Sequence, residues 1–201
     1  YDVAPSYFTS FAYIAEILEA ARKEPRGAIA VRSELFDAGI EAAEYVEEGH
    51  VLHFISYPAT FSYDALYRPR YADEMLVPPI GPIPKPNDEK LEPGIFVTIT
   101  GIPGLERLYE DVRRLGIRLY SNDTEAVPGS LRALPHIIPN KNILFQFARS
   151  GWSSVWLSMI VGTPLVVPDF DASDDPEIYF NNRAVEKLGI VTVYRGEPLE
   201  E

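Results

Sequence analysis

The stretch "ILFQFARSGWSSVWLSMIVGTPLVVP" (residues 143–168) is the most informative part of the sequence about the fold. It contains nineteen consecutive uncharged residues, Ser150 to Pro168. That length would meet the requirement of roughly 18 residues for a transmembrane helix. Five hydroxyl residues interrupt the run, however, and Gly162 and Pro164 break it before one long helix could form. The stretch therefore predicts a buried strand, a tight turn, a short helix near 152–161 and a second buried strand, and not a membrane span.

The same alternation of strand and helix continues on both sides of this stretch. An apolar helical face with a closing glycine at Gly116 predicts a helix near 105–115. Asp174 or Asp175 can cap a final helix from about Pro176 to Leu188, which Gly189 closes. The expected strands are "IFVTIT" (95–100), "IRLY" (117–120), a possible "HIIP" (136–139) and "IVTVY" (190–194). This order predicts an α/β, Rossmann-like domain over 95–201, with a mostly parallel sheet flanked by helices.

A change of composition precedes this domain. Residues 78–94 contain six prolines and three acidic residues, which favours a semi-rigid linker, although a proline-rich surface loop is the alternative. Residues 1–77 are interpreted as the tail of a preceding α/β domain. Its expected helices are an amphipathic one around 11–21 and one near 34–47, and its expected strands are 28–31, 51–56 and 74–77.

Composition excludes several classes of protein. A hydrophobic content of 46% is that of a globular chain, and a net charge of −12 opposes binding to nucleic acid or to an anionic membrane. The absence of cysteine excludes disulfides and thiolate metal sites. No signal peptide is visible, so a cytoplasmic location is expected. The chain begins at Tyr1 without methionine and is interpreted as a piece of a longer protein.

The turn before the predicted helix 152–161 has the residues of an anion site. In open α/β sheets ligands bind beyond the carboxyl ends of the strands, and free N–H groups at a helix start attract anions. Gly151 would let a ligand approach the backbone, Ser150, Ser153 and Ser154 add hydroxyl groups, and Arg149 can contact phosphate. A capped helix with a tight turn and no ligand explains these residues equally well.

A longer pattern resembles a known family. The run "SGWSSVWLSMIVGTPLVVPDF" and the following "DDPEIYFNNRAVEKLGI" are similar to the donor-binding half of GT-B glycosyltransferases, including UDP-glycosyltransferases and the peptidoglycan N-acetylglucosaminyltransferase. In that family a Gly-Trp or Ser-Gly turn opens a helix under the donor diphosphate. A second glycine eleven residues later is followed by X-Pro and a hydrophobic strand, a spacing that Gly151, Gly162 and Pro164 keep.

The resemblance implies a site. Its nucleotide- and diphosphate-binding residues would be Arg149, Ser150, Gly151, Trp152, Ser153, Ser154 and Gly101, and its sugar-binding residues would be Glu177 and Asn181. Two positions depart from the family. Leu157 stands where a glutamate holds the ribose hydroxyls, and Ile178 stands where the second member of a polar pair reads the sugar. Trp152 is expected to border the ligand cleft, and Trp156 to lie in the core.

Three further groups of residues are weaker candidates. The loop "TITGIPG" (98–104) places Thr100, Gly101 and Gly104 near the implied phosphates, although an ordinary strand-to-helix turn explains it as well. A catalytic base is not identified. Strand alternation explains His53 better than catalysis, and His50 and His136 have no stronger claim. The acidic residues of 169–177 suit a solvated loop with a helix cap, so no metal is expected and no cofactor beyond the nucleotide-sugar substrate.

Two functions therefore remain open on the sequence. The first is transfer of a sugar from a nucleotide-diphosphate donor, with UDP as the expected nucleotide, to an unknown acceptor. The second is a catalytically inactive GT-B-like binding or interaction module, which Leu157 and Ile178 favour. A sugar-nucleotide epimerase of the same architecture would need an acidic cluster in the turn helix, and this chain lacks one there.

Overall fold

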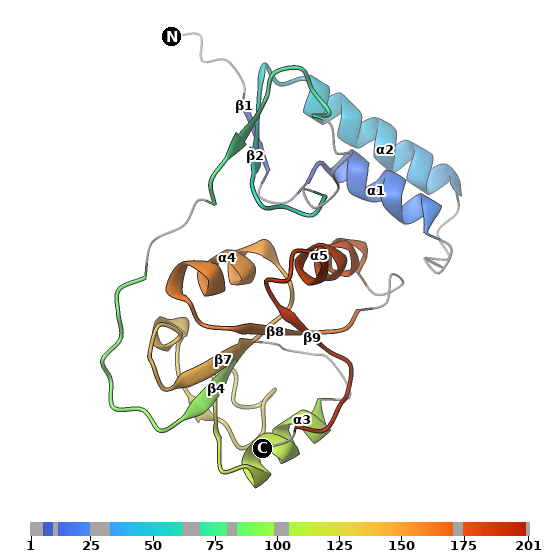
Figure 1. Cartoon of the computed structure of the whole chain (residues 1–201). Coiled ribbons are helices and arrows are strands. Elements are labelled where there is room, and N and C mark those ends of the chain that lie inside the picture. Colours follow the sequence, from blue (N-terminus) through green and yellow to red (C-terminus); the bar gives the residue numbers. More distant parts are fainter. Residues whose placement is uncertain are drawn as a thin grey trace. The chain divides into compact units, whose positions relative to one another are not determined.

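The computed structural model describes residues 6–9, 12–24, 33–61, 69–79, 84–98, 105–170 and 175–199 (Figure 1). By its internal contacts the chain divides into two compact units. Unit 1 comprises Tyr1–Ile80 and Phe170–Leu188, and unit 2 comprises Gly81–Asp169 and Gly189–Glu201.

A parallel six-stranded sheet forms the centre of unit 2. Its strands are β4 (Gly94–Val97), β5 (Arg118–Ser121), β6 (Leu131–Arg132), β7 (Ile143–Phe147), β8 (Leu165–Pro168) and β9 (Thr192–Tyr194). They pair in the order β6-β5-β4-β7-β8-β9, and every pairing is parallel. Counted along the chain from β4, this is the 3-2-1-4-5-6 order of the Rossmann fold, so the predicted fold class is confirmed.

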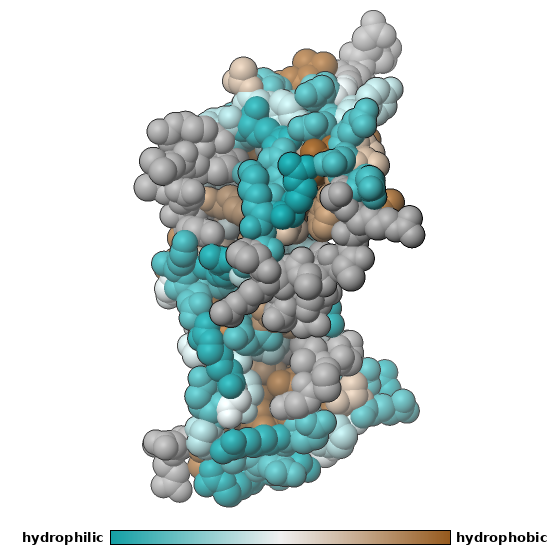
Figure 2. Space-filling model, turned by 90° about the vertical axis from the view of Figure 1, so that its right-hand side faces the viewer, coloured by the Kyte–Doolittle hydropathy of each residue, from teal (hydrophilic) through white to brown (hydrophobic). Residues whose placement is uncertain are grey.

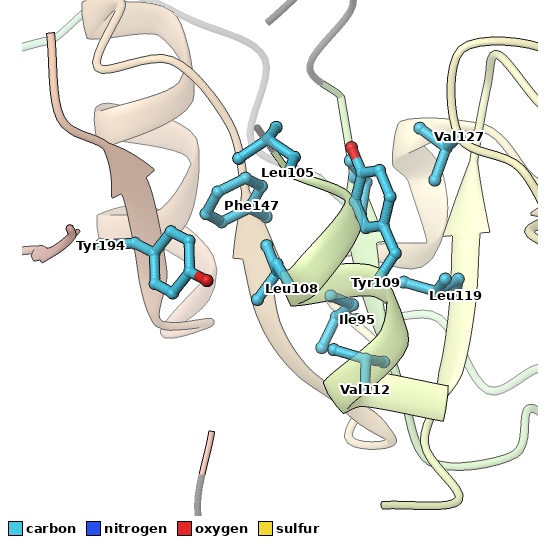
Figure 3. Close-up of a cluster of buried hydrophobic side chains, with 10 residues drawn as sticks. Ile95, Leu105, Leu108, Tyr109, Val112, Leu119, Val127, Phe147 and Tyr194 are labelled. Atoms are coloured by element: carbon cyan, nitrogen blue, oxygen red, sulfur yellow. The ribbon is translucent and has the colours of Figure 1, made fainter. Parts of the chain in front are cut away.

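One face of this sheet packs on α3 (Glu106–Arg114). Figure 3 shows Leu108 and Val112 of this helix beside Ile95 of β4 and Phe147 of β7, within one buried apolar cluster. Since neighbouring residues of a strand point to opposite faces, Ile95 and Val97 belong to this cluster whereas Phe96 does not.

The opposite face packs on α4 (Trp152–Val161). Here Phe96 lies with Tyr120 and Ile143 in a second buried cluster, against which Leu157 and Val161 of α4 pack. Both faces are therefore covered, as a doubly wound sheet requires. Both helices end at a glycine. Gly116 and Gly162 adopt φ values of 70° and 74°, in the left-handed region that favours glycine at a helix C-terminus.

Unit 1 contains a smaller parallel sheet with three helices. Its strands β1 (Ser6–Thr9), β2 (Leu52–Ser56) and β3 (Glu74–Val77) pair in the order β1-β2-β3. Its helices are α1 (Ile14–Lys23), α2 (Ser33–Glu48) and α5 (Pro176–Lys187). Ile17 and Ala21 of α1, Phe36 of α2 and Phe180 of α5 share one buried cluster. This explains why α5 groups with unit 1, although in sequence it lies between the two segments of unit 2.

The proline-rich segment is held against unit 2 where it is described. Residues 84–93 form no helix or strand. The Asn140 side-chain amide donates to Asn87 Oδ1 and to the Glu89 carbonyl, both at 2.9 Å, and Asn142 donates to the Leu91 carbonyl at 2.7 Å. The side chains of Asn140 and Asn142 thus hold residues 87–91 in place just before β4.

Two local expectations need comment. The possible strand at 136–139 is wrong, because Pro135–Ile137 forms one turn of 3-10 helix, in which Ile138 N donates to the Pro135 carbonyl at 3.0 Å. Proline at the first helical position favours such a turn. The edge strand is instead β6, two exposed residues without an apolar pattern. The strand expected at 28–31 lies outside the described residues.

Candidate functional site

The strand order of unit 2 has a topological switch point between β4 and β7. From β4 the chain continues to β5 on one side of it, whereas β7, on its other side, leads away to β8. The two connections diverge at the carboxyl ends of β4 and β7, and this divergence is where open α/β sheets bind ligands. Residues 148–151 follow β7 at this point and connect directly to α4. Residues 99–104, which include the candidates Thr100, Gly101 and Gly104, lie outside the described residues.

The turn after β7 presents the start of α4 without a side-chain cap. Gly151 is the N-cap residue, with φ −61° and ψ 135°, and its carbonyl accepts from Ser154 N at 2.9 Å and Val155 N at 3.2 Å. Apart from its two chain neighbours, no described residue has an atom within 4 Å of the place where a Cβ of Gly151 would stand. A glycine offers no side-chain oxygen to the N–H groups of the first turn, so an anion can take the position that a capping oxygen would occupy.

The predicted phosphate-binding residues differ in their exposure. Arg149 and Ser153 are exposed, and Gly151 and Ser154 are half-buried. Ser150 is fully buried, and the Trp152 ring is only 2% exposed, with its centroid 5.9 Å from that of Trp156. The Trp152 ring therefore packs in the interior beside Trp156, and does not border a cleft as expected. The side chains of Ser150 and Trp152 are therefore not exposed to a ligand.

The predicted sugar-binding residues lie on α5, in unit 1. Asn181 is fully buried, and its Oδ1 accepts a hydrogen bond from Thr60 Oγ1 at 2.5 Å. The Asn181 side chain thus ties α5 to the segment after β2. Glu177 is half-buried, and its pKa is raised, first by burial and then by the charge of Asp175. Of the two residues, only Glu177 presents part of its side chain at a surface.

The two residues that depart from the family pattern, Leu157 and Ile178, both pack within the fold. Leu157 is half-buried and packs against the cluster that contains Phe96 and Ile137. Ile178 is buried in the first turn of α5. At both positions the side chain contributes to packing, in place of the polar group that the resemblance would lead one to expect.

The sequence did not reveal one buried polar pair beneath α4. Ser158 Oγ donates to Gln146 Oε1 at 3.1 Å, and both side chains are buried. This bond links the middle of α4 to β7. It therefore helps to hold α4, whose first turn lies at the switch point, against the sheet. Alternation along "ILFQF" could have placed Gln146 on the face opposite Phe147, but no local pattern identifies Ser158 as its partner.

The acidic residues near α5 act as caps and ion-pair partners. Asp175 caps α5 as predicted, because Oδ1 accepts from Glu177 N at 3.1 Å and from Ile178 N at 3.3 Å. Asp169 forms an ion pair with Arg195 at 3.5 Å. Asp171 and Asp174 lie outside the described residues. Among the residues that are described, no group of three histidine, aspartate or glutamate side chains has a metal-binding arrangement.

The three histidines all have oxygen partners. His53 is buried, with Nδ1 3.0 Å from Asp73 Oδ2 and Nε2 2.9 Å from the Glu47 carbonyl. Both ring nitrogens of His53 thus have an oxygen partner, and the hydrogen bond with His53 lowers the pKa of Asp73. His50 Nδ1 lies 2.7 Å from the Val46 carbonyl, and His136 Nε2 lies 2.8 Å from Glu89 Oε1. His53 is therefore a structural residue.

A partly buried charged cluster links α1 and α2 in unit 1. Arg70 Nη2 bonds Glu44 at 2.7 Å and Glu19 at 3.2 Å. Glu47, only 1% exposed, accepts from Ala15 N at 3.3 Å and from the Tyr71 hydroxyl at 3.2 Å. Burial raises the pKa of the neighbouring Glu16 to about 7, against the lowering effect of the Arg70 charge. The positions of these groups, between two helices and away from the sheet's carboxyl edge, assign them to packing.

Unit 1 also has a shallow apolar hollow. Tyr57, Leu76, Val77 and Pro78 line it, and its volume is about 340 Å³. Tyr57 follows the last residue of β2, and Val77 ends β3, so the hollow lies at the carboxyl ends of two parallel strands. Its lining suits an apolar ligand group.

No helix in the described ranges of the chain has the length and apolar character needed to cross a membrane. The uncharged run 150–168 is divided, as predicted, into α4, the turn at Gly162 and β8.

Solved structures with the same fold are glycosyltransferases. The "Glycotransferase of kitacinnamycin" superposes with a TM-score of 0.57 and 16% identity, covering 97% of this chain and 58% of that one. UGT89C1 of Arabidopsis thaliana superposes with a TM-score of 0.55 and 12% identity, covering 95% of this chain and 52% of that one. The predicted resemblance to GT-B glycosyltransferases is thus confirmed at the level of the fold. The chain spans little more than half the length of either structure. No family model and no curated protein matches the sequence.

Proposed function

We propose that this chain is part of a glycosyltransferase that takes its sugar from a nucleotide-diphosphate donor, with UDP as the expected nucleotide. The observation that carries the proposal is the uncapped start of α4 at the switch point between β4 and β7, with Arg149 exposed one turn before it. The fold shared with two glycosyltransferases supports it.

The chemistry of such a transfer matches this arrangement. As the bond between the sugar and the diphosphate breaks, negative charge grows on the departing phosphate oxygens. N–H groups at the start of α4 and the Arg149 guanidinium would stabilise that charge without rearrangement, and would hold the donor in place for attack. The acceptor hydroxyl must lose a proton to a base. His53 is not a candidate for this base, because it is buried and both of its ring nitrogens lie within hydrogen-bond distance of oxygen atoms of unit 1.

The acceptor would contact unit 1. Its hollow beside Tyr57 and Leu76 is apolar and lies at the carboxyl ends of β2 and β3, the edge at which parallel sheets bind ligands. An acceptor with an apolar ring or chain and a free hydroxyl fits that lining. The acceptor's identity is not specified further by these residues.

The test is a calorimetric titration of the chain with UDP. Leu157 offers no hydrogen bond to the ribose hydroxyls, a loss of roughly 1.5–3 kcal/mol relative to a charged acceptor. We therefore expect weak binding, with a dissociation constant of the order of 1 mM, which corresponds to about −4 kcal/mol. Transfer activity is not expected from the chain alone. Submicromolar binding would contradict the role given to Leu157.

The second candidate is a GT-B-like module that binds a partner and has lost donor chemistry. The apolar packing of Leu157 and the burial of Ile178 favour it, since both positions have exchanged a ligand-binding group for a contact within the fold. If a folded chain shows no heat of binding with UDP at several millimolar, this candidate replaces the first.

A further inference from the structure

The helix α2 has an apolar face that nothing in the described part of the chain covers. Its inner side packs on unit 1 through Phe36 and Glu47. On its outer side the exposed fractions of Leu35, Tyr45 and Val46 are 61%, 82% and 55%. Figure 2, drawn from the side on which α1 and α2 lie in Figure 1, shows scattered brown hydrophobic residues among hydrophilic teal ones on unit 1.

The exposed apolar residues follow the spacing of a coiled-coil seam. Leu35, Ala38, Ala42 and Tyr45 of α2 are separated by alternating steps of three and four residues, Gly49 continues the spacing directly after the helix, and all five are exposed. In a heptad these are the a and d positions, the ones that pack against a second helix. The small residues at three of the five positions allow close approach of a partner backbone, and Leu35 and Tyr45 supply the large side chains.

A column of acids runs along one side of this seam. Glu34, Glu41 and Glu48 recur every seven residues, at the g positions of the same heptads, and all three are exposed. None of them forms an ion pair within the described residues, whereas Asp37 is paired with Arg22 and Glu44 with Arg70. The helix itself contains no basic residue. Three like charges beside an apolar seam select a partner of opposite charge.

The same column argues against a second copy of the chain as the partner. In an antiparallel pair of α2 helices the two glutamate columns would face each other, and like charges at close range are destabilising. In a parallel pair the glutamates would face Gly39 and Val46, which offer no charge. Neither arrangement gives the glutamates a partner, but a helix with Lys or Arg beside its apolar seam does.

We propose that the outer face of α2, from Leu35 to Gly49 with the glutamates at 34, 41 and 48, is a docking surface for a cationic amphipathic helix of another polypeptide. Its apolar seam gives affinity by burying Leu35 and Tyr45, and the glutamate column sets the register and the charge of the partner. This surface is independent of the donor site on unit 2.

The experiment uses the whole chain and two synthetic helical peptides of about three heptads. The seam peptide has leucine at a and d and lysine beside the seam, and the control peptide has the same composition in shuffled order. Fluorescence anisotropy at roughly 50 and 300 mM NaCl measures binding. We expect the seam peptide to bind at least tenfold more tightly than the shuffled one, and less tightly at the higher salt concentration. Equal binding of the two peptides, or no binding, overturns the proposal.

Variants separate this surface from the general negative charge of the chain. Tyr45→Ser and the triple change Glu34→Lys, Glu41→Lys, Glu48→Lys should each weaken seam-peptide binding about tenfold or more. A matched triple change of exposed acids in unit 2, Glu106→Lys, Glu110→Lys and Glu125→Lys, should weaken it less than threefold. A seam peptide with glutamate in place of lysine should regain binding to the α2 triple variant. Equal loss in both triple variants, failure of that exchange, or a dimer of the chain alone that Tyr45→Ser dissociates would each overturn the proposal.

Discussion

The helices α4 and α5 begin in opposite ways, although each follows a strand and a short connection. Asp175 caps α5, accepts from two N–H groups of its first turn, and is followed by Pro176 at the first helical position. The cap of α4 is Gly151, which has no side chain to offer, and exposed Arg149 lies two residues before it. At a helix start with a side-chain cap, the chain itself supplies acceptors for the first N–H groups. At a start without such a cap and with a cation nearby, an anion can act as the acceptor.

This difference separates residues that stabilise from residues that can bind. On α5, Asp175 and Asn181 are engaged with backbone N–H groups and with Thr60. On the turn before α4, Arg149, Gly151 and Ser153 are at least partly accessible. We therefore place the donor diphosphate at α4 and regard α5 chiefly as a structural helix of unit 1.

The largest expected effect is that of Arg149→Ala on nucleotide binding. A charged hydrogen bond to phosphate contributes roughly 1.5–3 kcal/mol, so UDP affinity should fall by about ten- to a hundredfold. Because Arg149 is exposed, the free energy of unfolding should change by less than about 0.5 kcal/mol. Calorimetry with UDP and urea unfolding measure the two quantities. Arg132→Ala, an exposed arginine on the edge strand β6, is the control and should leave UDP binding unchanged.

Leu157→Glu should increase the affinity of the chain for UDP. A carboxylate at this position can accept from the ribose hydroxyls and should tighten UDP binding by about tenfold. Leu157 also packs against the apolar cluster around Phe96, so the same change should lower the free energy of unfolding by roughly 1–3 kcal/mol. Titration at a temperature where both proteins are folded measures the affinity. Leu157→Gln, a neutral acceptor, should give a smaller gain; a folded glutamate variant without any gain contradicts the placement of the ribose.

Asp175→Ala tests whether the cap of α5 serves stability and not nucleotide binding. Loss of the cap leaves two N–H groups of α5 without their acceptor, and the free energy of unfolding should fall by about 1 kcal/mol. Asp175→Asn keeps a capping oxygen and should cost less. Neither change should alter UDP affinity if the diphosphate lies at α4, so a large loss of UDP binding would move the anion site to α5.

The smallest effect concerns the pH dependence of stability through Glu177. Burial and the charge of Asp175 raise its pKa in the folded state. The stability linked to this group is therefore fully present below its unfolded pKa, near 4.5, and is lost as the pH rises through the raised folded value. Asp175→Asn removes the second cause and should shift the Glu177 titration to lower pH in a carbon-detected NMR titration. An unchanged titration would show that burial alone raises the pKa.

The sequence predicts regular elements well and long-range partners poorly. The α4 turn, the Asp175 cap and the glycine ends of the helices depend on neighbours in the chain, and local pattern is enough to find them. Asn181 matches a spacing in the family, yet its partner Thr60 is 121 residues away, and no local signal shows that the amide is turned inward. Trp152 and Ser150 were expected at the ligand because of their positions, but burial of their side chains is decided by packing around α4.

UDP binding by the variant Gly151→Asp tests whether the donor diphosphate lies at the start of α4. The Cβ of an aspartate at this N-cap would lie within 4 Å of no other described residue apart from its chain neighbours, and aspartate suits the extended backbone there. It would cap α4 as Asp175 caps α5, raising the free energy of unfolding by a few tenths of a kcal/mol while occupying the N–H groups and repelling phosphate. We predict unchanged or slightly higher stability together with at least a tenfold loss of UDP affinity. UDP binding by this variant that is as tight as in the wild type would contradict a diphosphate site at the start of α4.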